Sequence, residues 1–126
     1  MLNLEKVQGD NMPQTIEYLG NKEWAVRWDI EQFSETTDMG TINGYKYYEL
    51  KFNKEPQYGD VVTALIRLKY TENEEDALKS NMVEQLHSGV SVQALDDEWE
   101  AFQTYRNEAK IIGRQLFNTE SNIETW

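Results

Sequence analysis

The stretch LDDEWEAFQTYRNEAKIIGRQL, residues Leu95–Leu116, decides the fold of the second half of the chain. Its apolar residues recur every three or four positions, which is the spacing that places side chains on one face of an α-helix. The members of this stripe are Leu95, Trp99, Phe102, Tyr105, Ala109, Ile112 and Leu116. Asp97 and Glu100 match a D-x-x-E variant of the capping box, which predicts a helix start at Asp96 or Asp97. The stretch therefore predicts one amphipathic helix of about five turns.

Carboxylates surround Trp99 at the start of this helix and raise the question of catalysis. Glycoside hydrolysis needs two carboxylates that face each other across a cleft, one of them in an apolar setting. The acids here, Asp96, Asp97, Glu98 and Glu100, stand at a helix start, where the helix dipole favours negative charge. We therefore predict no enzyme, and a hydrolase that uses Glu98 or Glu100 is kept only as a minor alternative.

Two segments precede this helix. TENEEDALKSNMVEQL, residues 71–86, predicts a helix because Thr71 and Glu74 form a capping box and acids fill the first turn. DVVTALIRLKY, residues 60–70, fits two patterns. An alternating strand pattern contains Val62, Ala64, Ile66, Leu68 and Tyr70, and a helical stripe contains Val61, Val62, Leu65, Ile66 and Lys69. Asp60 would be the N-cap of that helix. Periodicity alone leaves residues 60–70 open between helix and strand.

The N-terminal half shows the period of two that is typical of strands. In QTIEYLGNKEWAVRWDI, residues 14–30, the alternating apolar residues are Trp24, Val26, Trp28 and Ile30. A three-residue loop at Gly20–Lys22 would place Tyr18 opposite Trp24 and Ile16 opposite Val26. We expect this register, because it keeps the large apolar residues on one face, whereas a two-residue turn would not.

A second hairpin is predicted in MGTINGYKYYELKF, residues 39–52. Asn43-Gly44 is typical of a type I′ turn, and such a turn would pair Ile42 with Tyr45 and Met39 with Tyr48. One face would carry Tyr48, Leu50 and Phe52, and the other Tyr45, Tyr47, Glu49 and Lys51. We expect Tyr45 and Tyr47 to be exposed. They would form a contact surface or, alternatively, cover a sheet edge or pack on the helical half.

These segments together predict an α+β fold, with an N-terminal antiparallel β-hairpin sheet followed by a unit of two or three helices. The polar stretch NKEPQYGD, residues 53–60, marks the change of period between them. The predicted parts are an N-terminal arm (1–12), an antiparallel β unit (13–55), a helical unit (58–117) and a polar C-terminal tail (118–126).

The composition narrows the function classes. The 126 residues carry a net charge of −11 and no cysteine. Acid repels phosphate backbones, so we expect no direct nucleic-acid binding, although an acidic mimic of DNA remains an alternative. We expect no signal peptide and no membrane span, because neither a basic segment followed by an apolar run nor a long apolar window is present. We also expect no metal and no cofactor, because His87 is the only histidine and no phosphate-binding glycine motif is present.

The run W-x-x-F-x-x-Y-R, at Trp99, Phe102, Tyr105 and Arg106, resembles the W-x-x-Y-x-x-Y-R motif of bacteriophage tail-fibre-assembly and tail-associated proteins. The preceding residues 58–81 are similar to short helical modules of small phage proteins, in which two helices precede a long final helix. Phe102 replaces the usual Tyr of the motif. The resemblance covers about residues 58–117, implies a structural or assembly protein of a phage, and favours helix for residues 60–70.

The leading hypothesis is a non-enzymatic, tail- or fibre-associated virion protein that acts through protein–protein contacts. It would lie in the virion, and in the host cytoplasm during assembly, in a homo- or hetero-oligomer with other phage structural proteins. A tail-fibre assembly chaperone is the first alternative, and an acidic DNA-mimic inhibitor of a host defence protein is the second. The predicted interface residues are Tyr45, Tyr47, Trp99, Phe102, Tyr105, Arg106 and Trp126.

Overall fold

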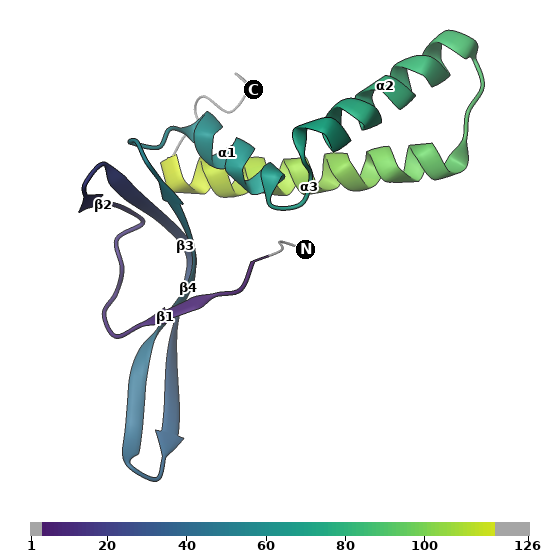
Figure 1. The fold of residues 1–126 in the computed structure, drawn as a ribbon. Coiled ribbons are helices and arrows are strands. Elements are labelled where there is room, and N and C mark those ends of the chain that lie inside the picture. Colours follow the sequence, from purple (N-terminus) through teal and green to yellow (C-terminus); the bar gives the residue numbers. More distant parts are fainter. Residues whose placement is uncertain (1–3, 118–126) are drawn as a thin grey trace. The chain divides into compact units, whose positions relative to one another are not determined.

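The computed structural model describes residues 4–117 and has the predicted α+β fold, with an antiparallel sheet followed by three helices (Figure 1). The described chain divides into two compact units between Gln57 and Tyr58. Residues 4–57 form the β unit and residues 58–117 form the helical unit. Trp126, a predicted interface residue, and the predicted tail 118–126 lie outside the described residues.

The β unit is one sheet of four antiparallel strands. The strands are β1 (Val7–Gly9), β2 (Ile16–Gly20), β3 (Glu23–Thr37) and β4 (Gly40–Phe52). Their order is β1-β4-β3-β2, so β1 and β2 lie at opposite edges and residues 10–15 cross from one edge to the other. The N-terminal arm predicted for residues 1–12 is therefore wrong in part. β1 pairs Val7 with Tyr47 and belongs to the sheet.

The predicted register of β2 and β3 is confirmed, but the predicted three-residue loop is wrong: Gly20 still pairs with Glu23, Leu19 is left unpaired as a bulge, and the turn is Asn21-Lys22. Tyr18 pairs with Trp24 and Ile16 with Val26. The backbone of Gly20, Asn21 and Lys22 has positive φ values of 94°, 52° and 64°, and this left-handed path closes the hairpin. The rings of Tyr18 and Trp24 lie 5.1 Å apart between centroids, so the register also brings two aromatic residues together across the strands.

The predicted turn at Asn43-Gly44 is wrong. β4 runs straight through these residues, and the chain turns at Asp38-Met39 instead, where Thr37 pairs with Gly40. Gly44 is needed for space rather than for a turn. A Cβ on it would lie 2.8 Å from the carbonyl oxygen of Gly9 and 2.9 Å from the ring of Phe33. The extended β3–β4 ladder satisfies more backbone groups than an early turn would, so it overrides the local turn preference.

A bulge divides β3 and β4 into two parts. Trp28 pairs with Tyr48 but Glu31 pairs with Lys46, so β3 has one extra residue here, and Asp29 has a φ of 52°. Before the bulge the register places one apolar set on a single face: Trp24, Val26, Trp28, Tyr48, Leu50 and Phe52. Beyond it β1 still pairs with Lys46 and Tyr45 of β4, and from the Phe33–Gly44 pair onward β3 and β4 continue as a two-stranded ribbon without β1 or β2 (Figure 1).

The helical unit consists of α1 (Tyr58–Arg67), α2 (Glu72–Ser88) and α3 (Gln93–Phe117). Residues 60–70, which the pattern left open, are helical up to Arg67. The buried side chains of α1 are those of the helical stripe: Val61, Val62, Leu65 and Ile66. Asp60 is not the N-cap, because α1 already begins at Tyr58 and Asp60 stands in its first turn.

The ends of α2 and α3 show how local chemistry fixes their limits. The capping box of Thr71 and Glu74 is confirmed, since each residue's backbone N–H donates to the side chain of the other. The predicted start of α3 at Asp96 or Asp97 is wrong. The helix begins at Gln93, and Asp96 instead accepts hydrogen bonds from Gln85 of α2 and from Ser91.

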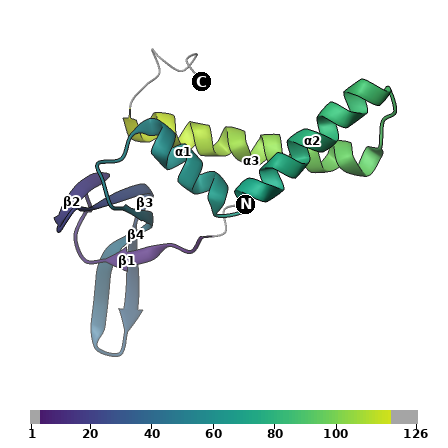
Figure 2. The ribbon, with the colours of Figure 1, turned by 45° about the horizontal axis from the view of Figure 1, so that its top comes forward.

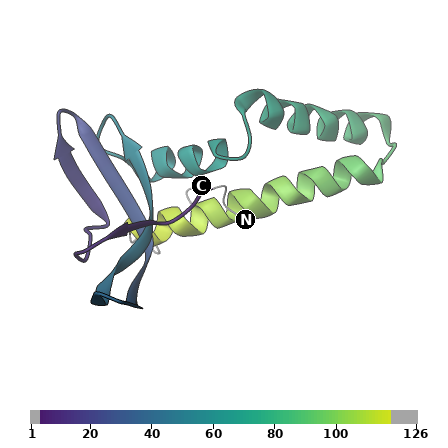
Figure 3. The same cartoon turned by 60° about the horizontal axis from the view of Figure 1, so that its bottom comes forward.

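The three helices pack unequally. α1 lies against the C-terminal half of α3, whereas α2 runs back along its N-terminal half as the other arm of a helical hairpin (Figures 2 and 3). Gly113 allows the close approach of α1, because a Cβ there would lie 2.9 Å from the ring of Tyr58. The core of the unit is therefore made by α1 and α3, and α2 contributes no buried residue.

Candidate protein-interaction site

The motif residues of α3 pack inside the helical unit. Phe102 and Tyr105 are 1% and 3% exposed, and Trp99 is half-buried with its ring 5.7 Å from that of Phe102. The Tyr105 hydroxyl donates a 2.8 Å hydrogen bond to the carbonyl oxygen of Leu65 in α1. The structure thus gives Phe102 and Tyr105 a packing role, and a partner cannot reach them in the folded chain.

Tyr70, between α1 and α2, closes this core. Its ring meets those of Phe102 and Tyr105 edge-on, at centroid distances of 5.0 and 5.8 Å. Burial, with a smaller contribution from Glu108, raises the pKa of Tyr105 above its ordinary value. Tyr105, with its raised pKa and its hydrogen-bonded hydroxyl, is therefore a neutral structural group. The aromatic residues of the α3 motif are explained by the packing that stabilises the helical unit.

The two tyrosines of β4 differ in their surroundings. Tyr45 is half-buried, but Tyr47 is only 9% exposed, so the prediction that both are exposed is wrong for Tyr47. Residues 10–14 cross this face of the sheet and share a hollow with Tyr47 and Arg27. The crossing follows from the positions of β1 and β2 at opposite edges, which the sequence did not reveal.

Arg27 organises the covered face. Its guanidinium forms ion pairs with Glu17 at 2.6 Å and Glu49 at 2.7 Å, and it lies 5.7 Å from the ring centre of Tyr47. Burial alone would lower the pKa of Arg27, but the bonds to the two carboxylates raise it overall. Because both ion pairs join neighbouring strands, Arg27 of β3 links β2 and β4 electrostatically, and its charge is already neutralised by carboxylates rather than open to an anion.

Arg106 is the last described member of the predicted interface. It is half-buried on α3 and belongs to a basic row with Lys110 and Arg114. Burial, followed by the charges of Arg106 and Arg114, lowers the pKa of Lys110. An interface role for Tyr45, Trp99 and Arg106 stays a prediction.

The surface that the sequence missed lies on α2 and the turn after it. Four large apolar residues here are exposed: Val83 by 65%, Leu86 by 80%, Val90 by 63% and Val92 by 44%. We call these four residues the apolar tip. Leu86 and Val90 line a shallow hollow together with Met82. The signal in the sequence is weak: Leu78, Met82, Val83 and Leu86 are the large apolar residues of an otherwise mostly polar helix.

The same region concentrates the acid of the chain. We define the helical arm as residues 72–101, which include α2, the turn and the first part of α3. It contains nine carboxylates and one lysine. That lysine, Lys79, is already paired at 2.6 Å with Glu75, which also binds Arg67 at 2.8 Å. These pairs leave the rest of the arm strongly negative.

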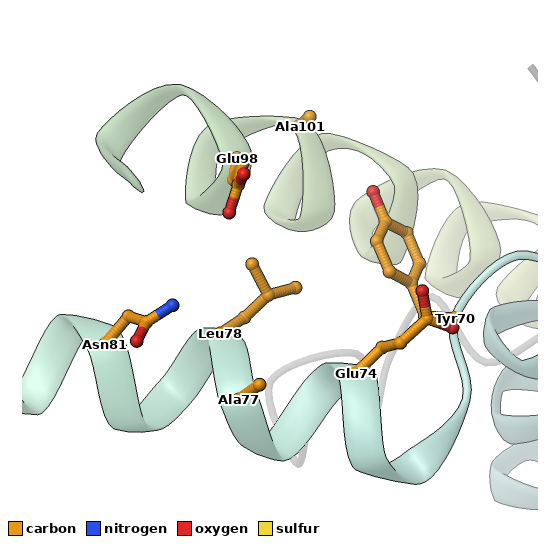
Figure 4. A pocket seen from close by; sticks show the side chains of 7 residues that line it. All are labelled: Tyr70, Glu74, Ala77, Leu78, Asn81, Glu98 and Ala101. Atoms are coloured by element: carbon orange, nitrogen blue, oxygen red, sulfur yellow. The ribbon is translucent and has the colours of Figure 1, made fainter. Parts of the chain in front are cut away.

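A second hollow, of about 360 Å³, lies between α2 and α3 on the arm (Figure 4). In Figure 4 the side chain of Leu78 points across the gap from α2, that of Glu98 points back from α3, and the ring of Tyr70 stands at one end. Its complete lining is Tyr70, Glu74, Ala77, Leu78, Asn81, Glu98 and Ala101. We call this hollow the arm groove. Its lining is mainly apolar and includes two carboxylates, Glu74 and Glu98.

Residues 4–117 contain no group of three or more potential metal ligands. Within the same range, no helix combines the length and apolar composition that a membrane crossing needs. Comparisons of the chain with protein-family models, with curated proteins and with solved structures find no match. The class that the fold and surface define is a small α+β protein with an acidic, apolar-tipped helical hairpin.

Proposed function

We propose that this protein is a non-enzymatic binding protein whose contact surface is the helical arm. The observation that carries the proposal is that α2, 17 residues long, buries none of them. Helices of this length owe most of their stability to packing of an apolar face, and isolated ones are marginal in water. The exposed apolar tip is therefore best explained as a surface that a partner covers.

The negative charge of the helical arm, next to its exposed apolar residues, favours a surface that contacts a protein over a surface that is only solvated. Apolar residues rimmed by like charges are typical of contact surfaces in which the apolar part gives affinity and the charge selects the partner. A pure mimic of DNA would present carboxylates without such an apolar patch. The acidic-inhibitor alternative therefore has less support from this surface than protein binding has.

The proposed setting is a bacteriophage tail or tail fibre, with a virion component as the leading form and an assembly chaperone as the alternative. The support is the resemblance of the motif at Trp99, Phe102, Tyr105 and Arg106 to tail-associated proteins. The packing of Phe102 and Tyr105 gives the motif a structural meaning: it holds α3 on α1 and leaves α2 free. In either form the arm would contact other phage structural proteins.

Mass spectrometry of purified phage particles tests the setting, and a variant of the apolar tip tests the surface. We expect peptides of the chain in wild-type particles and a loss of incorporation for Val83→Glu/Leu86→Glu. Ile42→Glu, at another exposed apolar residue, is the control and is expected to leave incorporation unchanged. Absence of the wild-type chain from particles would contradict the virion form. A stable complex with a fibre protein before assembly would then support the chaperone.

A further inference from the structure

The arm groove has features that select one kind of occupant. Its lining combines small residues, Ala77 and Ala101, with the aliphatic side chain of Leu78 and, at one end, the ring of Tyr70. Small residues allow a partner helix to approach closely, and Leu78 offers a contact for an apolar side chain. Ala77 and Ala101 are exposed, as are Glu74 and Glu98, so the groove is too shallow to enclose a small molecule.

The charges at the rim restrict the occupant further. Glu74 is held by the capping box at Thr71, which lowers the pKa of Glu74 and keeps it ionised. Among the described residues, Glu98 forms no ion pair with a lysine, arginine or histidine. An incoming cation would therefore gain an attraction that the chain itself does not supply, whereas an incoming carboxylate would be repelled.

We propose that the arm groove binds a basic amphipathic helix of a partner protein, which completes a three-helix packing with α2 and α3. This inference rests on the proposed binding function and names the chemistry of the partner. Apolar side chains of that helix lie against Leu78 and between Ala77 and Ala101, and its lysine or arginine side chains lie beside Glu98. This is the helix-in-groove mode of recognition, in which residues at helical spacing anchor the ligand.

A second copy of the chain fits the groove less well. Its own arm is as acidic, so two arms would repel each other. Its basic row, at Arg106, Lys110 and Arg114, is half-buried on α3 and is not presented as a free basic face. We therefore commit to a partner protein, and self-association becomes one outcome of the test.

The test uses the full chain and a synthetic helix. The probe is a 17-residue peptide, as long as α2, with leucines on one helical face and lysines on the other. A scrambled peptide of the same composition keeps the charge but has no apolar face. Titration is followed by calorimetry and by NMR shifts assigned to the lining residues. We expect the patterned peptide to bind in the groove, and the scrambled peptide to bind at least about tenfold more weakly.

Matched variants locate the binding. Leu78→Gln is expected to weaken the patterned peptide about tenfold, and Glu98→Lys by several-fold, with the loss from Glu98→Lys reduced at high salt. The controls are Ile111→Gln and Glu35→Lys, two exposed positions outside the helical arm, which are expected to stay within about twofold of wild type. Circular dichroism confirms that each variant is folded.

Three results would overturn the inference. They are equal binding of the scrambled peptide, an equal loss of affinity with Ile111→Gln, and a dimer in light scattering whose NMR shift changes map to the groove residues. Its failure is separable from failure of the proposed function. If tip variants are lost from particles while Leu78→Gln is incorporated normally, the arm binds a partner but the groove does not. If neither change affects incorporation, the binding function of the arm is wrong as well.

Discussion

Two leucines of the helical unit give a quantitative test of its packing. Leu65 of α1 is fully buried, whereas Leu86 of α2 is 80% exposed. Leu65→Ala removes buried methyl groups and leaves a cavity, which costs about 2–5 kcal/mol of unfolding free energy. Leu86 buries only a fifth of its surface, so the same change forfeits a fifth of roughly 2 kcal/mol, about 0.4 kcal/mol. The better helix propensity of alanine offsets part of even that loss.

The assay is urea unfolding of the full chain, followed by circular dichroism at a wavelength that reports the helices. We expect the midpoint to fall clearly for Leu65→Ala and to stay close to wild type for Leu86→Ala, with equal slopes for both. A loss above about 1.5 kcal/mol for Leu86→Ala would refute the reasoning. It would mean that α2 is packed in the free protein and needs no partner to cover it.

Three further outcomes follow from the contacts. Arg27→Met leaves the carboxylates of Glu17 and Glu49 together without their cation, so we expect the unfolding free energy to fall by about 3 kcal/mol. An unchanged midpoint of denaturant unfolding would mean that these ion pairs do not stabilise the sheet. Bonding to Lys79 first, and to Arg67, holds the pKa of Glu75 below its ordinary value of 4.5, so the folded state binds its proton less readily than the unfolded chain. Stability from this group is present above pH 4.5 and is lost as the pH falls through the lowered pKa; Glu75→Gln should flatten that part of the stability profile, and an unaltered profile would contradict the pairing. Gly44→Ala should lower the melting temperature, because its Cβ would press on backbone 2.8 Å away, and an unchanged melting temperature would count against that close approach.

The sequence predicted those parts of the fold that depend on local periodicity. The β2–β3 register followed from keeping Tyr18 and Trp24 on one face, and the start of α2 followed from the capping box at Thr71. The helical stripe of α3 was also found, because its spacing is regular over many turns. In each case neighbouring residues carried enough information to fix the element.

What the sequence did not predict depends on contacts between distant segments. The local turn preference of Asn43-Gly44 is overridden by the long hydrogen-bonded ladder between β3 and β4. Tyr47 is buried because residues 10–14 cross its face of the sheet, and no pattern near Tyr47 in the sequence indicates that crossing. The burial of Phe102 and Tyr105 inside the helical unit depends on a distant segment in a similar way. An apolar stripe shows that a helix face is buried but not what buries it, and here α1 does. The apolar tip went unnoticed because α2 has only a weak pattern.

The unequal burial of the three helices affects how the helical unit could bind a partner. α1 and α3 supply the buried residues of the core and α2 supplies none, so α2 can present its side chains to a partner while that core stays packed. A partner that covers the apolar tip or the arm groove would add packing that α2 lacks in the free chain. Binding would therefore stabilise α2 more than the other helices.

Hydrogen exchange of the full chain, measured with and without the basic amphipathic peptide, tests the binding role of the helical arm most directly. Alone, the amides of α2 should exchange much faster than those in the buried parts of α1 and α3, because few packed contacts oppose local opening. With the peptide, exchange should slow within residues 72–101 and stay unchanged in the β unit. Protection of α2 equal to that of α1 in the free chain, or no slowing on addition of the peptide, would contradict the account.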